Sequence, residues 1–244
     1  MRFFLFLVFI TIIACQPSTQ KHDSKSVQTA FLEALEHDSS IQDFFWRQGG
    51  LFTKQQIHKN RDSIEFYCQM LKNSSFESIK VVQHDSSNYF ELGRYHNSTN
   101  PDSILSLIAW KKDSLEWVKE LEVLSPIAIQ QIVPQDSIKA ALQTWENLSN
   151  QHQHAQLVQQ LYAPHGFYFN DGYIYQGIPA ITEKYDYMSK PKWHIRLSTI
   201  QSLQATDSLY YDVGQYVSSG RGHYFILWQL QASGQWQVLL DFNF

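Results

Sequence analysis

The sequence predicts an α+β fold of two tandem domains, each with N-terminal helices packed on an antiparallel sheet. Apolar residues recur at helical spacing at the start of each half of the chain and alternate as in strands toward its end. A set of strand landmarks also occurs twice: Gly93, Tyr95, Trp110 and Trp117, then Gly214, Tyr216, Trp228 and Trp236. Helices followed by a meander indicate an α+β layout, and the repeated landmarks indicate one domain present twice.

Residues 1–14 have the composition of a secretion signal, with one cation and an apolar run before Cys15. The run is shorter than the roughly 20 residues of a membrane-spanning helix. Ile-Ile-Ala-Cys resembles the lipobox of bacterial lipoproteins, which implies a lipid on Cys15 and a position in the bacterial cell envelope. By the same analogy Gln16 favours the outer membrane, and the polar residues 15–25 suit a flexible tether. An uncleaved anchor or an ordinary signal peptide is the alternative.

Charge and cysteine content limit the partners and the chemistry. The formal net charge is −4 and the sequence has no basic run, so we expect no nucleic-acid partner. With Cys15 assigned to the lipid, Cys68 has no cysteine with which to form a disulfide. Cys68 lies between Ile64 and Leu71 at helical spacing, which favours a buried core thiol over a nucleophile.

The first domain is predicted over residues 26–124. Helical periodicity begins at Val27, a short apolar run at 41–46 predicts a second helix, and a third follows the capping residues at 60–63. Alternating β-branched and aromatic residues then predict a four-stranded antiparallel meander. Its strands are expected at residues 76–83, 89–95, 104–110 and 115–124.

Prolines bracket a linker at residues 125–135, and the second domain is predicted over residues 136–244. Two helices at 138–148 and 157–161 precede a hairpin at 167–175, whose Asp171-Gly172 pair suits a tight turn. A third helix starts at Gly177, with Pro179 in its first turn. Four strands follow, beginning near residues 193, 209, 223 and 235. The sequence predicts no equivalent of the hairpin in the first domain.

The second half resembles the nuclear transport factor 2-like superfamily, which includes SnoaL-like cyclases and ketosteroid isomerases. The matching segments are Leu-Tyr-Ala-Pro at 161–164, the Asn-Asp-Gly hairpin, Gly-Ile-Pro-Ala-Ile at 177–181, Gly-Gln-Tyr at 214–216, and Trp228 with the segment 234–241. The first half matches only through its helices and landmarks. The resemblance implies two cone-shaped domains, each with a curved sheet, and it says little about activity.

Catalysis in such a cone would need an acid and a base with pKa values shifted toward neutrality. The candidate carboxylates are Asp212, Asp241, Glu183 and Asp186, and each also suits a structural role. His194 and His223, near strand starts, are candidate pocket histidines. The histidines at 152, 154 and 165 lack a recognisable ligand spacing, so we expect neither a metal nor another cofactor.

Aromatic residues give the clearer functional signal, because ligand pockets are apolar with a few polar tips. The alternative is that the same rings only fill the core. The residues that we expect to contact a ligand are Tyr168, Tyr175, Tyr185, Trp193, His194, Tyr216, Trp228 and Asp241.

The sequence therefore favours a lipid-anchored, periplasm-facing, non-catalytic protein that binds a small apolar or peptide-like ligand or an envelope protein. One alternative is a SnoaL-like isomerase, cyclase or hydrolase that acts in the second domain. Another is a purely structural assembly or immunity-type factor, for which the sequence gives no positive sign. A carboxylate close to a tyrosine or histidine in an open pocket would favour the enzyme. We expect the pocket in the second domain, because only that half shows the hairpin, and we expect a monomer whose two sheets face each other.

Overall fold

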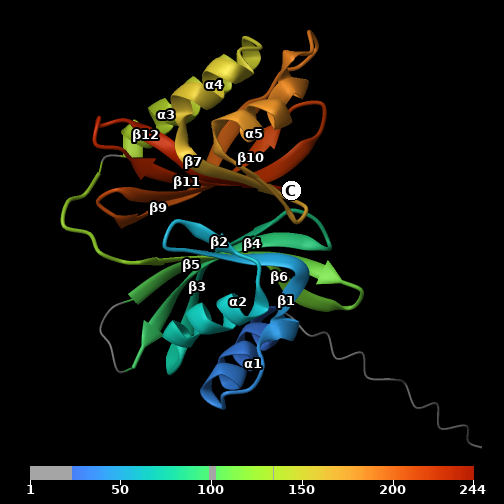
Figure 1. Ribbon diagram of the computed structural model, residues 1–244, viewed down its shortest axis with the longest axis vertical. Coiled ribbons are helices and arrows are strands. Elements are labelled where there is room, and N and C mark those ends of the chain that lie inside the picture. The colour runs from blue at the N-terminus through green and yellow to red at the C-terminus, as the bar shows by residue number, and fades with distance from the viewer. Residues whose placement is uncertain (1–23, 99–102, 134) are drawn as a thin grey trace, which may run out of the picture.

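The computed structural model describes residues 24–98, 103–133 and 135–244, which form two α+β domains in tandem (Figure 1). The predicted signal peptide, Cys15 and most of the predicted tether lie outside these residues. Within them, no helix is long and apolar enough to cross a membrane.

The first domain places a helix, a hairpin and a second helix before four long strands. In order, its elements are α1 Ser24–Glu36, η1 Gln42–Phe44, β1 Phe45–Thr53, β2 Gln56–His58, α2 Arg61–Cys68, η2 Gln69–Leu71, β3 Ser74–Gln83, β4 Asn88–Asn97, β5 Ser103–Asp113 and β6 Glu116–Pro126. Asn60 caps α2, because its side chain accepts hydrogen bonds from the backbone amides of Asp62 and Ser63.

The second domain repeats this order, with helix α4 in the place of the 3-10 turn η1. Its elements are α3 Gln135–Asn150, α4 His154–Leu161, β7 Tyr162–Asn170, β8 Tyr173–Gln176, α5 Gly177–Lys184, η3 Tyr185–Ser189, β9 Arg196–Thr206, β10 Leu209–Val217, β11 Arg221–Leu230 and β12 Trp236–Asn243. The predicted hairpin turn is present, with positive φ angles of 46° at Asp171 and 77° at Gly172.

Each domain has one six-stranded sheet, in the orders β2-β1-β6-β5-β4-β3 and β8-β7-β12-β11-β10-β9. The α+β class and the antiparallel four-stranded meanders are confirmed. The sheets are nevertheless mixed, because β1 pairs in parallel with β6 and β7 with β12. The expectation of purely antiparallel sheets missed these two pairs, which join segments far apart in the sequence.

Two predictions for the first domain are wrong. The apolar run at 41–46 is not a helix, because it forms a single 3-10 turn and the start of β1. The first domain also has a hairpin, made by β1 and β2. Its turn residues, Lys54 and Gln55, have φ angles of 49° and 60°, in the left-handed region that sequence patterns associate with glycine, asparagine and aspartate.

The register of the two sheets confirms the repeat residue by residue. Trp110 pairs with Lys119 just after a bulge in the β5–β6 ladder, and Trp228 pairs with Val238 just after the same bulge in the β11–β12 ladder. Gly50 and Phe167 likewise pair with Leu121 and Leu240 on the parallel side. The landmarks that match in the sequence therefore occupy matching positions in the two sheets.

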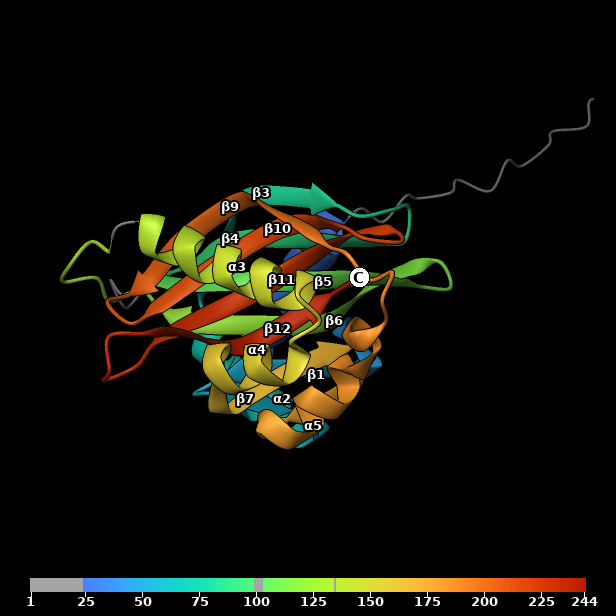
Figure 2. The same ribbon diagram turned by 90° about the horizontal axis from the view of Figure 1, so that it is seen from above.

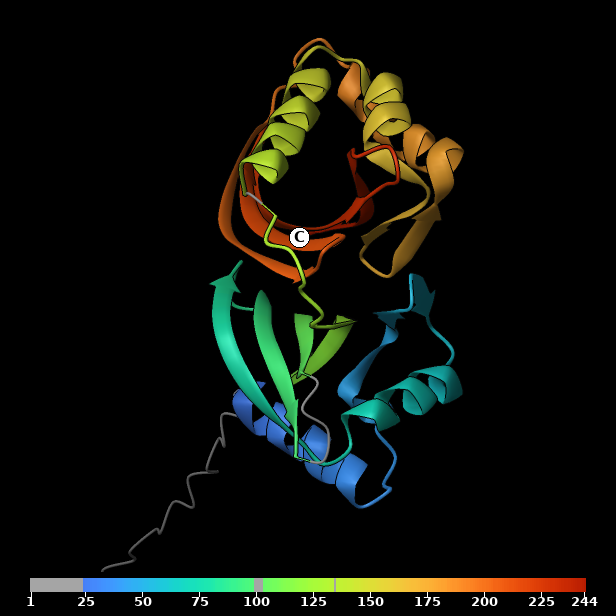
Figure 3. The same ribbon diagram turned by 90° about the vertical axis from the view of Figure 1, so that its left-hand side faces the viewer.

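The two sheets lie against each other at the centre of the molecule, and the helices cover the outer ends (Figure 1). Figure 2 shows the strands of the two sheets stacked in projection. The sheets share one apolar core, in which Phe90 and Leu107 of the first domain pack in the same cluster as Phe242 and Leu227 of the second. Seen from the side, the second sheet curves beneath α3 on one flank and α4 and α5 on the other (Figure 3).

Candidate functional site

A cavity of about 230 Å³ lies inside the second domain, between its helices and the concave face of its sheet. Half of its lining side chains are aromatic: Trp145, Tyr185, Tyr187, Trp193, Tyr216 and Tyr224. Its polar lining comes from Ser218, Asn243 and Asp241, together with the hydroxyl groups of the tyrosines. An apolar cavity with a few polar groups is the usual form of a small-molecule site.

Asp241 is the only carboxylate among the described residues of this lining. Its neighbours along β12, Leu240 and Phe242, belong to the core between the sheets, so strand alternation turns Asp241 into the domain interior. Its Oδ2 atom accepts a hydrogen bond from the Tyr162 hydroxyl at 2.6 Å and another from the Tyr185 hydroxyl. The two hydroxyl groups are also 2.8 Å from each other.

Burial raises the pKa of Asp241 from 3.8 to about 6, although the hydrogen bonds from Tyr162 and Tyr185 act in the opposite direction. The side chain is only 3% exposed. Among the described residues no lysine, arginine or histidine forms an ion pair with Asp241. Both tyrosine bonds go to Oδ2, and no described donor bonds to Oδ1. The cavity therefore contains a buried carboxylate that lacks a cation.

The other predicted carboxylates differ from Asp241. Asp212 is buried and its pKa is raised to about 6 by burial, but it lies beside Tyr224 and Trp228 and does not line the cavity. Glu183 and Asp186 are exposed to solvent. Asp186 lies 3.9 Å from His154, and no cluster of three metal-ligating side chains occurs in the described parts of the chain.

The structure brings half of the predicted ligand-contacting residues together. Tyr185, Trp193, Tyr216 and Asp241 line the cavity. Tyr168 and Tyr175 lie behind this lining, and the Tyr168 ring contacts that of Tyr185 at a centroid distance of 5.3 Å. The remaining two do not line the cavity: Trp228 is fully buried in the core, and His194 is exposed at a neighbouring depression. A ligand-binding role for the set stays a prediction.

The sequence did not single out Trp145, Tyr162, Tyr187 or Tyr224. Trp145 could have been identified as an aromatic on the buried face of α3, whereas Tyr187 is half-buried in the 3-10 segment η3. Tyr224 follows His223 on β11, so strand alternation places only one of the two inside, and the inside residue is the tyrosine. His223 instead faces the first domain.

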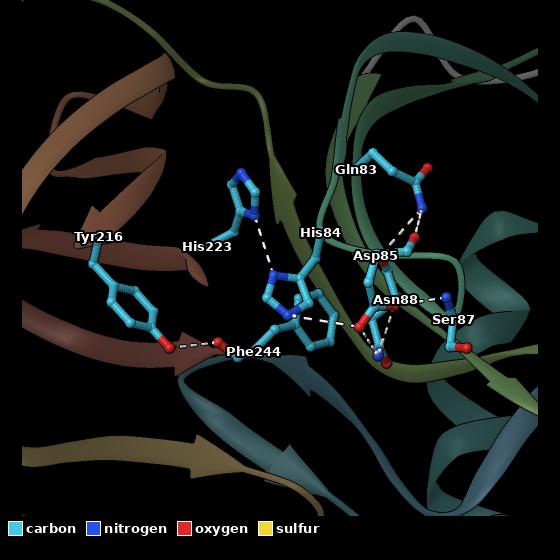
Figure 4. A network of polar contacts seen from close by, with 8 residues as sticks. All are labelled: Gln83, His84, Asp85, Ser87, Asn88, Tyr216, His223 and Phe244. Carbon is cyan, nitrogen blue, oxygen red and sulfur yellow. Dashed lines mark hydrogen bonds and ion pairs between the residues drawn. The ribbon is translucent and has the colours of Figure 1, made fainter. Parts of the chain in front are cut away.

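One wall of the cavity connects to the contact between the domains (Figure 4). The Tyr216 hydroxyl donates a hydrogen bond of 2.7 Å to the carbonyl oxygen of Phe244, whose ring stacks on His84 of the first domain. The Nδ1 atoms of His84 and His223 are 3.3 Å apart. Burial, and to a lesser extent the neighbouring His84, lower the pKa of His223, so the neutral form of the His223 ring is favoured.

The interior of the first domain contains a buried ion pair. Lys119 and Glu122 are both fully buried there, with the Lys119 Nζ atom 2.8 Å from Glu122 Oε2. The Tyr95 hydroxyl donates to Glu122 Oε1 at 2.6 Å, and Gln28 donates to Tyr95. The buried Lys119–Glu122 ion pair of the first domain thus contrasts with Asp241 of the second domain, for which no ion pair is found among the described residues.

The sequence matches no known protein-family model and no curated protein. Solved structures similar to it include an NTF-2 like protein of unknown function from Shewanella oneidensis, at 14% identity and a TM-score of 0.41, over 46% of this chain and 98% of that one. Another is a ketosteroid isomerase-like protein from Erwinia carotovora, at 15% identity and a TM-score of 0.36, over 44% and 92% of the two chains. A third is an NTF-2 like protein from Silicibacter pomeroyi, at 10% identity and a TM-score of 0.38, over 45% and 92%.

Two of these three neighbours are described as NTF-2 like proteins and the third as ketosteroid isomerase-like, the names expected from the second half of the sequence. Each match spans about half of this chain. Identities of this size concern the fold and carry no activity to this protein.

Proposed function

We propose that this protein binds a small, largely apolar ligand in the cavity of its second domain, with Asp241 as the polar anchor. The observation that carries the proposal is a carboxylate at an aromatic cavity whose Oδ2 accepts two tyrosine hydrogen bonds and whose Oδ1 has no donor among the described residues. Oδ1 is not among the fully buried atoms without a partner, so we infer that it opens to the cavity, where a ligand donor can reach it. The cavity of about 230 Å³ is below the range of about 300–1,000 Å³ for drug-sized ligands, so the ligand is small.

A pair of neighbouring serines tests this placement. Ser218 is half-buried and lines the cavity, whereas Ser219 is exposed and does not. Tryptophan at 218 should fill the cavity, and tryptophan at 219 should leave it open. Small aromatic and aliphatic alcohols, amides and amines are screened by saturation-transfer NMR. We expect hits shared by the wild type and Ser219→Trp and lost in Ser218→Trp. Hits that Ser218→Trp retains, or no hits with the wild type, would contradict the proposal.

A second candidate function is proton transfer, which the hydrogen bonds from Tyr162 and Tyr185 to Asp241 favour. A carboxylate whose pKa is about 6 can act as a general base near neutral pH, and tyrosine hydroxyls can donate to developing negative charge. The test is loss of deuterium from α-deuterated cyclic ketones, followed by NMR. Exchange that depends on Asp241 would establish this function, and exchange equal to that of buffer would exclude it for these substrates.

The anchor at Cys15 is also a proposal, supported by the lipobox-like segment. A lipid there would place both domains beside the bacterial outer membrane, tethered through residues 15–25. Cys15→Ser should abolish incorporation of labelled fatty acid and release the protein from membrane fractions. Cys68→Ser is the matched control, because Cys68 is buried in α2 and should not affect labelling. Labelling that persists in Cys15→Ser would refute the anchor.

We further propose that the chain from Lys25 onward is a monomer, since its two sheets already cover each other's apolar faces. Light scattering that shows an obligate dimer would contradict this.

A further inference from the structure

The two domains place an acidic side chain at the same interior position. Glu122 pairs with Ile108 and Leu51, and Asp241 pairs with Ile226 and Tyr168 at the corresponding points of the second sheet. By the same register Val238 corresponds to Lys119. The first domain can therefore be used as an internal reference for what a carboxylate at this position requires.

In the first domain the chain itself meets that requirement. The ammonium group of Lys119 lies 2.8 Å from Glu122 Oε2 and 3.3 Å from the centroid of the Phe31 ring. Glu122 Oε1 accepts hydrogen bonds from Tyr95 at 2.6 Å and Ser106 at 3.1 Å. An ammonium group held by a carboxylate and an aromatic face combines an ion pair with a cation–π contact.

In the second domain these partners are absent or turned away. Val238 replaces the lysine. Tyr216, at the position of Tyr95, donates to the carbonyl oxygen of Phe244, and Tyr224, at the position of Ser106, points its hydroxyl at Asp212 Oδ2 at 3.4 Å. Both tyrosines line the cavity. Each carboxylate thus accepts two hydroxyl hydrogen bonds on one oxygen, but Glu122 has a lysine at its other oxygen and Asp241 has no cation there among the described residues.

We propose that the cavity binds a small organic ammonium ion, whose charged group faces Asp241 and whose methyl or methylene groups pack on the surrounding aromatic rings. This inference rests on the proposed function and names its ligand class. A buried charge is costly without a partner, so the ligand supplies the cation that Lys119 supplies in the first domain.

The other charged and titratable groups around Asp241 agree with a cationic ligand. The groups that face it are tyrosines, at positions 162, 168, 185, 187, 216 and 224, with Asp212 beyond Tyr224. No basic side chain lines the cavity in the described residues. Lys192, Arg196 and Arg221 line the neighbouring depression. Arg196 and Arg221 pair with Val217 rather than with Tyr216, so they lie on the opposite face of the sheet from the cavity lining.

The test compares choline with its neutral carbon isostere, dimethylbutanol, in which a tert-butyl group replaces the trimethylammonium group. Binding to the full soluble chain is measured by isothermal titration calorimetry at about pH 8, where Asp241 is ionised. We expect choline to bind at least about tenfold more tightly than the isostere. Asp241→Asn should remove this preference. Asp212→Asn should keep it, because Asp212 is a buried carboxylate of the same sheet outside the cavity lining.

The wild type alone provides a second readout should Asp241→Asn fail to fold. Lowering the pH to about 5 protonates Asp241 and should weaken choline binding severalfold, with little effect on the isostere. An isostere that binds as tightly as choline would overturn the ammonium inference and leave the proposed ligand site intact. Absence of choline binding would also overturn it, and the proposed site would then be judged by the separate Ser218 and Ser219 screen.

Discussion

At the scale of single residues, the protonation of Asp241 connects the cavity to the stability of the fold. A pKa raised from 3.8 to about 6 means that the folded state binds a proton more tightly than the unfolded state. The favourable contribution is complete below about pH 4 and is lost as the pH rises through about 6. The full effect corresponds to about 3 kcal/mol.

Asp241→Asn should remove this pH dependence. Between about pH 4 and about pH 7 the free energy of unfolding of the variant should rise relative to wild type by up to about 3 kcal/mol. Urea unfolding across this pH range measures the difference, and the effects of Asp212 and Glu120, whose pKa values are also raised, cancel in the comparison. Parallel pH profiles for the two proteins would show that the fold does not raise the pKa of Asp241.

The buried pair in the first domain gives a second prediction. Lys119→Met should lower the free energy of unfolding by about 3–5 kcal/mol, because it leaves Glu122 buried without a cation. The double variant Lys119→Met with Glu122→Gln should recover much of this loss, since no uncompensated charge remains. Denaturant unfolding of the three proteins measures both effects. Equal losses in the single and double variants would mean that packing, and not charge, decides the stability here.

Part of the site could be predicted at this scale. Tyr185, Trp193, Tyr216 and Asp241 were expected from aromatic content and strand position, and they line the cavity. The bonds to Asp241 could not be predicted, because Tyr162 lies 79 residues and Tyr185 lies 56 residues before it in the chain. Such contacts depend on the parallel pairing of β7 with β12, which no local pattern indicates.

At the scale of elements, the β7–β8 hairpin also docks on the first domain. Lys59 Nζ donates to the carbonyl oxygen of Gly172 at 2.6 Å, and Lys111 Nζ lies 2.8 Å from Asp171 Oδ1. A Cβ atom at Gly172 would lie 2.7 Å from Gln48 Oε1 and 2.9 Å from the Trp46 ring. The turn therefore needs glycine for its positive φ angle and for this close approach.

A comparison of two glycines distinguishes the effect of the positive φ angle from the effect of the close approach to the first domain. Gly172 and Gly234 have φ angles of 77° and 81°, but only Gly172 has atoms within 4 Å of an added Cβ. Gly234→Ala should cost about 1–2 kcal/mol through backbone strain. Gly172→Ala should cost at least about 1 kcal/mol more, through crowding against the first domain. Thermal and urea unfolding measure the stability of the two variants. Equal losses of unfolding free energy would mean that the hairpin turn is not closely packed against the first domain.

Turn chemistry explains why one hairpin was predicted and the other was missed. The residue types of Asp171-Gly172 predict a tight turn. Lys54 and Gln55 adopt left-handed backbone angles although neither residue type favours them. The helices with clear periodicity and the four antiparallel strands of each half were predictable because their patterns are local. The placement of β1 depends on pairing with β6, about 70 residues later.

At the scale of the whole molecule, the shared core between the sheets should make the two domains unfold together. Phe242 of the second domain contacts Phe90 of the first at a ring-centroid distance of 5.4 Å. Phe242→Ala should cost about 3–5 kcal/mol and shift one common transition. Calorimetry and tryptophan fluorescence should give coincident curves for wild type and variant. Two separate transitions, of which only the second-domain one shifts, would contradict a shared core.

The central claim, that the ligand site is the cavity of the second domain, is tested most directly by NMR of the tryptophan indole N–H groups. The chain has seven tryptophans, of which Trp145 and Trp193 line the cavity and Trp110 and Trp117 lie in the first domain. On addition of choline, the signals of Trp145 and Trp193 should shift progressively while those of Trp110 and Trp117 stay in place. Shifts confined to the first-domain tryptophans, on addition of choline or of a hit from the small-molecule screen, would contradict the account.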